Sequence, residues 1–418
     1  MSPTTRNRVL GICGALALLL AGPAGADTYN VDRFDDSTAN QCSIYSGNDC
    51  ALRGAIIRAN AHPGDDVVRL QAGTYTLSIP GADEDSCQTG DLDVTDTVLI
   101  LGKGPELTVV DAGGDGGVND RVFDVHAPGE RLTLRGLTVT GGSPDLGTGG
   151  GIRAVEGSLR LETCIVTGNE LSGYSGTAVY STPDAPGDLT EIVDSWITGN
   201  TGQFSVLWTG VTLFERTTVS GNTQTQLSST VAIFGEGSLL VDSTFEASTG
   251  STMSEAVMIW GTASAIEGCT LVGNGGPALV VATSVSANVS NTLLVGWCGG
   301  DGQLTTLGGN LESPGDTCGL GGSDLVNIAD PGLSELGFFG GPAPVYQPLT
   351  GSPAVDAPVA AGNCPEDEDQ RGLSRPRDGD GNGNAVCDIG AVELAGPGEI
   401  FVETFDCGFT TPWSGVEP

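Results

Sequence analysis

LRLETCIVTGN (residues 159–169) decides the fold, because close variants of this stretch recur along the middle of the chain. Each copy combines two short alternating strands with a turn, and the copies align on a glycine: Gly141, Gly168, Gly199, Gly221, Gly273 and Gly296. The steps between these glycines are 27, 31, 22, 52 and 23 residues, and the step of 52 fits two units, with a degenerate copy at residues 239–250. A period of about 20–30 residues without a helical pattern indicates a solenoid, in which each unit buries its apolar face against its neighbours. We therefore predict an all-β chain folded as a parallel β-helix.

Two positions in each unit predict the interior of this coil. The residues four and two positions before each glycine are small or apolar: Leu137/Val139, Cys164/Val166, Ser195/Ile197, Thr217/Val219, Cys269/Leu271 and Thr292/Leu294. Side chains two residues apart point to the same side of a strand. We expect Val139, Val166, Ile197, Val219 and Leu271 to form a single interior file.

Polar residues recur at the bend between the two strands of each unit. They are Glu162, Asp194, Glu215, Asp242, Glu267 and Asn291, preceded by Arg135. Because rungs lie roughly 4.8 Å apart, we expect one mostly acidic ladder. It is either a solvated corner that satisfies a bent backbone or a stripe that binds a divalent cation or a glycan. The asparagines after the turn glycines are expected to adopt left-handed backbone angles and to stack amide on amide: Asn169, Asn200, Asn222 and Asn274.

The first 26 residues have the pattern of a secretory signal. Arg6 and Arg8 precede an apolar run at residues 9–21, which ends in the small-residue sequence Ala24-Gly25-Ala26. Such a pattern is typical of a cleaved signal rather than of a membrane span. We expect cleavage near Ala26 and a secreted or cell-surface protein.

The charge balance argues against two classes of partner, nucleic acid and anionic lipid. The chain holds 52 Asp and Glu against 16 Lys and Arg, and its net charge of −36 becomes −38 without Arg6 and Arg8. A surface this acidic is not suited to nucleic acid or anionic lipid. In an exported chain, the acidic excess indicates solubility or calcium binding. We expect a monomer.

Eleven cysteines become ten once Cys13 leaves with the signal, and export permits disulfides. Local spacing predicts three bridges: Cys42–Cys50, Cys298–Cys318 and Cys364–Cys387. Cys164 and Cys269 share an inward column but lie about four rungs apart, roughly 19 Å, too far for a bridge. They are expected to be buried thiols, and Cys87 and Cys407 have no assigned partner.

The coil is flanked by segments of different composition. Residues 51–62 place Leu52, Ala55, Ile56 and Ala59 on one helical face, which suits a short amphipathic helix over the open end of the coil. We divide the chain into a signal (1–26), an N-terminal cap (27–66), the coil (67–300), a closing module fastened by Cys364–Cys387 (301–395) and a tail (396–418). His62 and His126 are each expected to be isolated surface residues.

Both flanks resemble known families. CALRGAIIRAN (residues 50–60) resembles the CSLREAI-type N-terminal domain of exported bacterial β-helix proteins, although Ala51 and Gly54 stand where that family has Ser and Glu. Likewise, GSPAVDA, DQRGLSRPRDG and CDIGAVE within residues 351–393 resemble the choice-of-anchor Q domain. The resemblance implies a right-handed, pectin-lyase-like β-helix held outside the cell, but no particular reaction.

One motif suggests a metal. Asp378, Asp380 and Asn382 fall in DGDGNGN, which matches the first half of a calcium loop. The bidentate Glu expected at the twelfth position is absent, because Ile389 stands there and Asp388 comes one residue early. Calcium binding and a flexible Gly/Asp turn both fit this loop.

No catalytic set emerges from the sequence. Two histidines without a Gly-x-Ser-x-Gly elbow do not support a nucleophile triad, and Lys103 is the lone lysine for a lyase base. We therefore predict a non-catalytic protein that contacts extracellular polysaccharide or matrix through the long faces of the coil. The alternative is a polysaccharide lyase or glycoside hydrolase whose site the sequence does not reveal.

Overall fold

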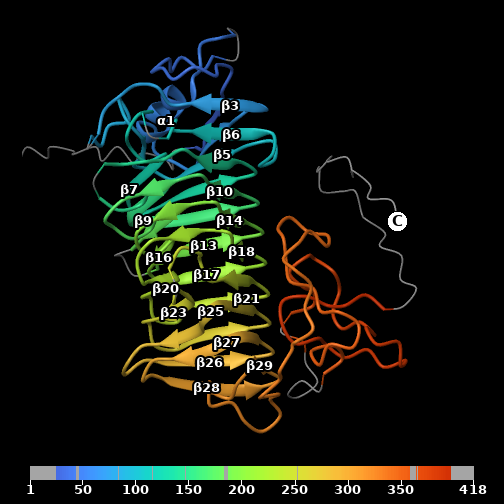
Figure 1. Ribbon diagram of the computed structural model, residues 1–418. Helices are drawn as coiled ribbons and strands as arrows, with labels where there is room; N and C mark the ends of the chain where they lie inside the picture. Colours follow the sequence, from blue (N-terminus) through green and yellow to red (C-terminus); the bar gives the residue numbers. More distant parts are fainter. Residues whose placement is uncertain are drawn as a thin grey trace, which may run out of the picture.

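The computed structural model describes residues 25–396 except 44–46, 83, 115, 146, 183–186, 252, 358–363 and 365. It shows the predicted right-handed parallel β-helix with one short helix (Figure 1). Twenty-six strands form one continuous sheet, and every pairing between its named strands is parallel. The predicted signal at residues 1–26, except Gly25 and Ala26, and the tail beyond residue 396 lie outside the described residues.

The sheet wraps into three faces, which we call A, B and C. Face A contains β4 (Leu92–Val94), the first part of β7 (Phe123–Arg135), the first part of β9 (Ile152–Glu162), β12 (Val179–Ser181), β16 (Leu207–Thr209), β20 (Ser229–Ile233), β23 (Glu255–Ile259) and the second part of β25 (Thr270–Val281). Face B contains β1 (Thr28–Asn30), β2 (Asp66–Arg69), β5 (Val98–Leu101), the second parts of β7 and β9, β13 (Thr190–Val193), β17 (Thr212–Glu215), β21 (Leu239–Val241), β24 (Ser264–Glu267), β26 (Ser286–Ser290) and β28 (Gln303–Gly308).

Face C completes each turn of the coil. It contains β3 (Gly73–Thr76), β6 (Thr108–Asp111), β8 (Thr138–Thr140), β10 (Ile165–Thr167), β14 (Trp196–Thr198), β18 (Thr218–Val219), β22 (Thr244–Glu246), the first part of β25, the first part of β27 (Leu293–Gly299) and β29 (Leu311–Ser313). The second part of β27 pairs with β25 on face A. Three two-residue strands, β11 (Glu170–Leu171), β15 (Thr201–Gly202) and β19 (Thr223–Gln224), form a small separate sheet beside it.

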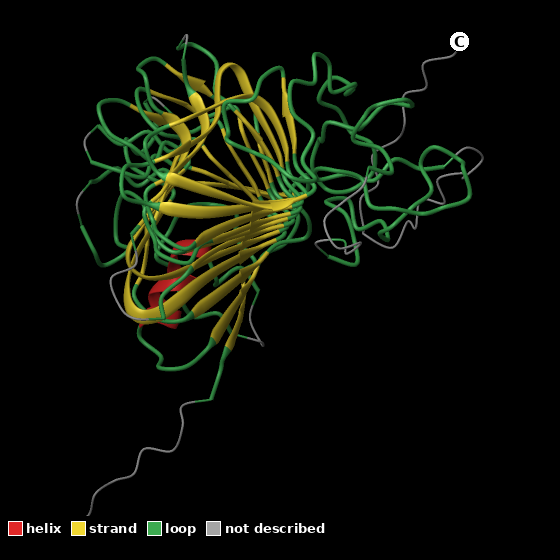
Figure 2. Cartoon of the chain, turned by 90° about the horizontal axis from the view of Figure 1, so that it is seen from below, coloured by secondary structure: helices red, strands yellow, loops and turns green. Residues whose placement is uncertain are grey.

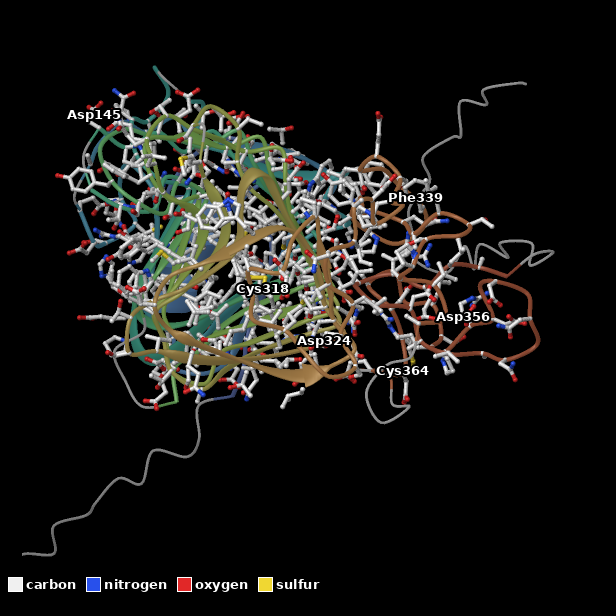
Figure 3. The ribbon with its side chains drawn as sticks, turned by 60° about the horizontal axis from the view of Figure 1, so that its bottom comes forward. Asp145, Cys318, Asp324, Phe339, Asp356 and Cys364 are labelled. Carbon is white, nitrogen blue, oxygen red and sulfur yellow. A yellow bond between two sulfur atoms is a disulfide. The ribbon has the colours of Figure 1, made fainter. Side chains whose placement is uncertain are left out.

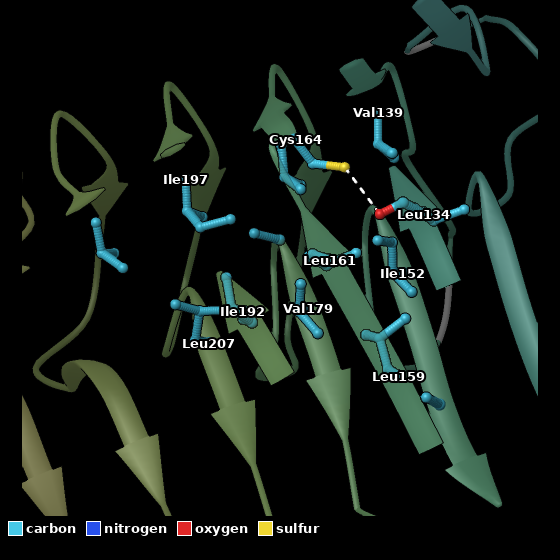
Figure 4. Packing of buried hydrophobic residues seen from close by; sticks show 14 of the residues in the cluster. Leu134, Val139, Ile152, Leu159, Leu161, Cys164, Val179, Ile192, Ile197 and Leu207 are labelled. Carbon is cyan, nitrogen blue, oxygen red and sulfur yellow. Dashed lines mark hydrogen bonds between the residues drawn. The ribbon is translucent and has the colours of Figure 1, made fainter. Parts of the chain in front are cut away.

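The predicted interior file exists. Val139, Val166, Ile197, Val219, Phe245 and Leu271 pair in register on successive rungs and are all fully buried. Neighbouring faces add further buried Leu, Ile and Val residues, shown with Cys164 and Leu134 in Figure 4. Phe245 belongs to the unit read as degenerate, so that unit contributes a full rung.

The acidic ladder was predicted as one column, and this prediction is wrong. Glu162, Glu215 and Glu267 pair in register with Val193, Val241 and Ser290, whereas Asp194, Asp242 and Asn291 come one residue later in their rungs. The later position is the bend itself. It has a positive φ of 41–65° in seven consecutive rungs: Gly136, Thr163, Asp194, Arg216, Asp242, Gly268 and Asn291.

The asparagine prediction is right about stacking and mostly wrong about backbone angles. Asn169 Nδ2 donates to Asn200 Oδ1 at 2.9 Å, and Asn200 Nδ2 donates to Asn222 Oδ1 at 3.0 Å, all within the buried interior. The left-handed conformation belongs instead to the preceding glycines, with φ between 63° and 66°. Asn274 differs, because it has φ of 47°, is exposed and takes no part in the ladder.

Different devices cover the two ends of the coil. The predicted helix is α1 (Leu52–Asn60), which buries Leu52, Ala55, Ile56 and Ala59 against the first rungs (Figure 2). At the other end the sheet continues past residue 300 through β28 and β29. There the Cys298–Cys318 bridge joins the core cluster, and Figure 3 shows Cys318 over that end.

The module predicted to close the coil lies along its flank instead (Figures 1 and 3). Gln370 Nε2 donates to Thr218 Oγ1 at 2.7 Å, and Thr270 Oγ1 on a rung further along accepts from the Ala391 amide at 3.1 Å. Tyr346 and Arg375 add hydrogen bonds to Glu246 and Asp242. The module therefore covers the outer side of face C.

All three predicted disulfides form, and Cys164 and Cys269 are free and buried as expected. Cys87 is also free and buried, while Cys407 lies outside the described residues. Burial raises the pKa of the Cys87 and Cys164 thiols, to about 12 and about 11. In the described part of the chain, no helix is long and apolar enough to cross a membrane.

Candidate functional site on face A

One outward column on face A carries the most chemically varied side chains of the coil. Asp93, Asp124, Arg153, Tyr180 and Trp208 pair in register on five successive rungs. Each alternates with inward apolar neighbours in its strand, so each projects from the outer side of the sheet. The column is acidic at the N-terminal end of the coil and aromatic towards its middle.

The aromatic end extends over four rungs and is called here the aromatic strip: Tyr180, Trp208, Phe234 and Trp260. Tyr180 and Trp208 stack with centroids 6.4 Å apart, Trp208 and Phe234 lie 4.2 Å apart, and Phe234 and Trp260 stack at 5.7 Å. Trp260 is 46% exposed and the other three rings are partly exposed. The strands of this face are labelled at the left of Figure 1, away from the C-terminal module.

The acidic end is a buried cluster of Asp91, Asp93, Asp120 and Asp124, called here the acidic cluster. All four carboxylates are at most 3% exposed. Arg121 Nη1 lies within 3.5 Å of three of them, those of Asp91, Asp120 and Asp124. Asp93 has no arginine partner, since its Oδ2 accepts only the Cys87 amide at 2.7 Å and its buried Oδ1 accepts nothing.

Burial, neighbouring charges and hydrogen bonds give these carboxyl groups different pKa values. Burial first, and then the negative charge of neighbouring carboxylates, raises the pKa of Asp93 to about 7 and holds the pKa of Asp91 well above its usual range. Burial acts on Asp124 in the same direction, but hydrogen bonds from His126 and Arg153 outweigh it and lower its pKa. Carboxyl groups with raised and lowered pKa values are therefore packed side by side in this cluster.

His126 was predicted to be an isolated surface residue, and this is wrong. Its Nε2 lies 3.2 Å from Asp124 Oδ2 and 3.0 Å from Arg153 Nη2, and only 23% of its side chain is exposed. The hydrogen bond to Asp124 raises the pKa of His126. His62 likewise contacts Asp66, with Nδ1 3.3 Å from Oδ1.

The segment at residues 84–91 contacts the acidic cluster, since the Cys87 amide donates to Asp93 Oδ2 at 2.7 Å. Arg53 fastens this segment by donating to the Gly90 and Asp91 carbonyls at 2.7 Å each. Arg53 is itself buried and paired with Asp36 at 2.6 Å. A hollow of about 340 Å³ exists near Cys298 and Gln303, but none of its lining residues is charged.

The bend residues on face B are engaged in structural contacts. Glu162 pairs with Arg135 and Arg160, and Arg216 pairs with Asp194 and Glu215. Asp242 is buried against Arg375 of the C-terminal module. These pairs fit the solvated-corner interpretation better than a cation-binding or glycan-binding stripe.

The predicted calcium loop lies in the C-terminal module. Asp378 and Asp380 offer carboxylate oxygens within 4.8 Å of one from Asp356, a third acidic residue that the sequence motif did not reveal. Asn382 is exposed, and its amide donates to Asp378 Oδ1 and Asp380 Oδ1 at 3.0 and 2.9 Å. Asp388 is buried beside this group, accepting from the Asp356 amide at 2.8 Å and from the Leu394 amide at 2.6 Å. Calcium binding by this loop stays a prediction.

No protein-family model and no curated protein matches the sequence. Among solved structures, the chain is similar to a pectate lyase (12% identity, 89% of this chain and 98% of the other, TM-score 0.46) and to the pectin methylesterase of Aspergillus niger (12% identity, 68% and 87%, TM-score 0.39). It is also similar to the A-module of a mannuronan C-5 epimerase of Azotobacter vinelandii (16% identity, 68% and 90%, TM-score 0.34). The strand pairing of the chain itself shows that it is a parallel β-helix.

Proposed function

We propose that the protein binds a neutral extracellular polysaccharide along the aromatic strip and has no catalytic activity. The observation that carries the proposal is the row of four rings on consecutive rungs of face A, with neighbouring centroids 4.2–6.4 Å apart and each ring at least partly exposed to solvent. The row spans about 14 Å, three rung spacings of roughly 4.8 Å. A rigid, periodic row of rings suits a polymer of repeating rings.

The chemistry of the rings favours a sugar ligand. An aromatic face is electron-rich, and the C–H groups on the face of a pyranose ring carry partial positive charge and little polarity, so the two surfaces pack together. Contiguous exposed apolar side chains in a soluble protein also mark an interaction site. The strip stands out here because only 5% of all residues are aromatic.

The charge of the chain selects among polysaccharides. A net charge of −36 repels polyanions, so uronate polymers are disfavoured. Within the strip itself there is no charged side chain, which leaves neutral glycans as the ligand class.

Binding to a panel of soluble neutral and uronate polysaccharides, measured by calorimetry, tests this proposal. We expect binding to neutral members, weakened about tenfold or more by Trp208→Ala or Trp260→Ala, since buried aromatic contacts dominate interface energies. Phe338→Ala is the matched control, because Phe338 is 64% exposed but lies in the C-terminal module. Equal binding by all three variants, or binding to uronates only, would contradict the proposal.

The alternative is a glycoside hydrolase or polysaccharide lyase acting at Asp93 and Asp124. A carboxyl with a raised pKa beside one with a lowered pKa is the pattern of a general acid and an ionised partner. Against it, Asp93 and Asp124 are at most 1% exposed, so a substrate oxygen cannot come within hydrogen-bond distance of either. Product release from any polysaccharide in the panel that disappears in Asp124→Asn would establish this alternative.

We further propose that the chain is exported, as its N-terminal pattern and its three disulfides favour. The resemblances to the CSLREAI-type and choice-of-anchor Q domains rest on the residues quoted above. They fit a protein held at the cell surface with the aromatic strip facing outward. Detection of the chain in the culture medium or on intact cells, before and after deletion of residues 1–26, checks this.

A further inference from the structure

We propose that the acidic cluster binds one calcium ion through carboxylate oxygens of Asp91, Asp93 and Asp124. This site is separate from the predicted loop at Asp378, and the inference does not rest on polysaccharide binding. The three residues each offer an oxygen within 4.8 Å of the other two. Calcium–oxygen bonds of about 2.3–2.6 Å allow two ligand oxygens to lie up to about 5 Å apart.

A buried carboxylate oxygen without a hydrogen-bond partner indicates a bound cation. Asp93 is 0% exposed, and its Oδ1 accepts no hydrogen bond. Its other oxygen is held by the Cys87 amide at 2.7 Å, which fixes the orientation of the carboxylate. A buried acceptor without a partner is costly, whereas a cation beside it would remove that cost.

The charge balance requires a compensating cation or protons. The four buried carboxylates of the cluster face two guanidinium groups, Arg121 and Arg153, which leaves a formal charge of −2 when His126 is neutral and −1 when it is protonated. Arg53 does not compensate it, because Arg53 is paired with Asp36. One divalent cation neutralises the cluster when His126 is neutral, and so do two protons.

The available ligand atoms favour calcium over zinc. The ligand atoms that Asp91, Asp93 and Asp124 bring together are all carboxylate oxygens, and His126 is not part of this group. Hard cations such as Ca²⁺ prefer oxygen ligands. Asp85 links the site to solvent, from which an ion enters. Its side chain is 72% exposed, and one of its carboxylate oxygens lies within 4.8 Å of ligand atoms of Asp93 and His126.

Calorimetric titration of calcium chloride into chelator-treated full-length protein tests the proposal, and Asp93→Asn is the decisive variant. Asparagine keeps an oxygen for the Cys87 amide but removes the charge, so the fold is retained. We expect a binding event that survives in Asp378→Ala/Asp380→Ala and loses at least about tenfold in affinity in Asp93→Asn. Exposed Asp316 lies outside both acidic groups, and Asp316→Asn is the matched control.

A second measurement stands independently of the variant. Calcium titration of Asp378→Ala/Asp380→Ala removes the contribution of the loop, so it should show roughly one ion bound per chain at the acidic cluster. An unchanged isotherm in Asp93→Asn, or no calcium binding by Asp378→Ala/Asp380→Ala, would overturn the proposal. Zinc binding that depends on His126, without calcium binding, would overturn it as well.

Discussion

Arg375 Nη2 donates a hydrogen bond of 2.9 Å to Asp242 Oδ1, and this contact joins the C-terminal module to a rung of the coil 133 residues earlier in the chain. The same guanidinium donates to Glu393 Oε1 at 2.6 Å and to the Gly390 carbonyl at 2.8 Å. Arg375, Asp242 and Glu393 are all buried. One buried cation held between two carboxylates therefore links the module to the coil, in addition to the hydrogen bonds of Gln370, Ala391 and Tyr346.

Replacing Arg375 with methionine should strongly destabilise the protein. It leaves Asp242 and Glu393 buried without their cation, a loss of about 3–5 kcal/mol for a broken buried pair. Urea unfolding followed by circular dichroism measures the change. Arg69→Met, at an exposed arginine of β2, should change the stability by no more than about 0.5 kcal/mol. Equal stability of the two variants would show that the contact does not hold the module in place.

Stability should fall as the pH rises from 4 to 7. Burial raises the pKa of Asp93, Asp242 and Asp388 to about 7, from an ordinary value of 3.8. In this window the folded chain binds more protons at these groups than the unfolded chain, so raising the pH favours unfolding. The melting temperature should be lower at pH 8 than at pH 5, without added calcium.

The pH dependence should become weaker in Asp93→Asn/Asp242→Asn. Each asparagine removes a carboxyl that holds its proton more tightly in the folded state, so the slope between pH 4 and pH 7 decreases. Asp65→Asn, at an exposed carboxylate, should retain the slope of the parent. A melting temperature that rises from pH 5 to pH 8 in the parent protein would be incompatible with this account.

Calcium should also bind the loop of the C-terminal module if Asp356, Asp378 and Asp380 act together. In Asp93→Asn, added calcium should raise the melting temperature, and this rise should disappear when Asp378→Ala and Asp380→Ala are added. Binding of a ligand to the folded state alone stabilises it in proportion to the logarithm of its concentration. If calcium does not raise the melting temperature of Asp93→Asn, the prediction is wrong. Asp316→Ala is the control and should leave the rise unchanged.

The asparagine ladder should contribute more to stability than an exposed asparagine of the same motif. Asn200 accepts from Asn169 and donates to Asn222 and to the Val166 carbonyl, all within the interior. Asn200→Ala leaves these groups unpaired, at about 1–3 kcal/mol for each buried group. Asn274→Ala, at the exposed relative of that position, should cost less than about 1 kcal/mol. Similar losses in urea unfolding would show that the ladder adds nothing.

The sequence predicts the interior well because the apolar columns repeat with each rung. Every copy has an apolar residue two positions before its glycine, as Val166 and Ile197 illustrate. Close packing leaves little freedom in the size and polarity of the side chain at this position. The bends are less constrained. A shift of one residue moves Asp194 out of the column of Glu162, and both positions accept polar residues, so composition alone does not reveal the register.

The face A site was missed for a different reason. Its residues are far apart in the chain, and the first rungs do not share the regular sequence and spacing of the later copies. A periodic signal was nevertheless present: Tyr180, Trp208, Phe234 and Trp260 follow one another at 28, 26 and 26 residues. Asp93 and Asp124 are separated by 31, a step within the range of the glycines. Such spacing places Asp93 and Asp124 in one outward column, whereas Phe234 and Trp260 lie two residues beyond Ala232 and Met258, the residues that continue the column of Trp208.

The lateral position of the C-terminal module has a mechanical consequence. It contacts rungs from Thr218 to Asn291 rather than only the last one. Tension applied near residue 396 would therefore load several tiers in shear at once, instead of peeling the final strand away from its neighbour. Shearing requires many hydrogen bonds to break together, so this arrangement protects the coil from unravelling when its C-terminal side is pulled.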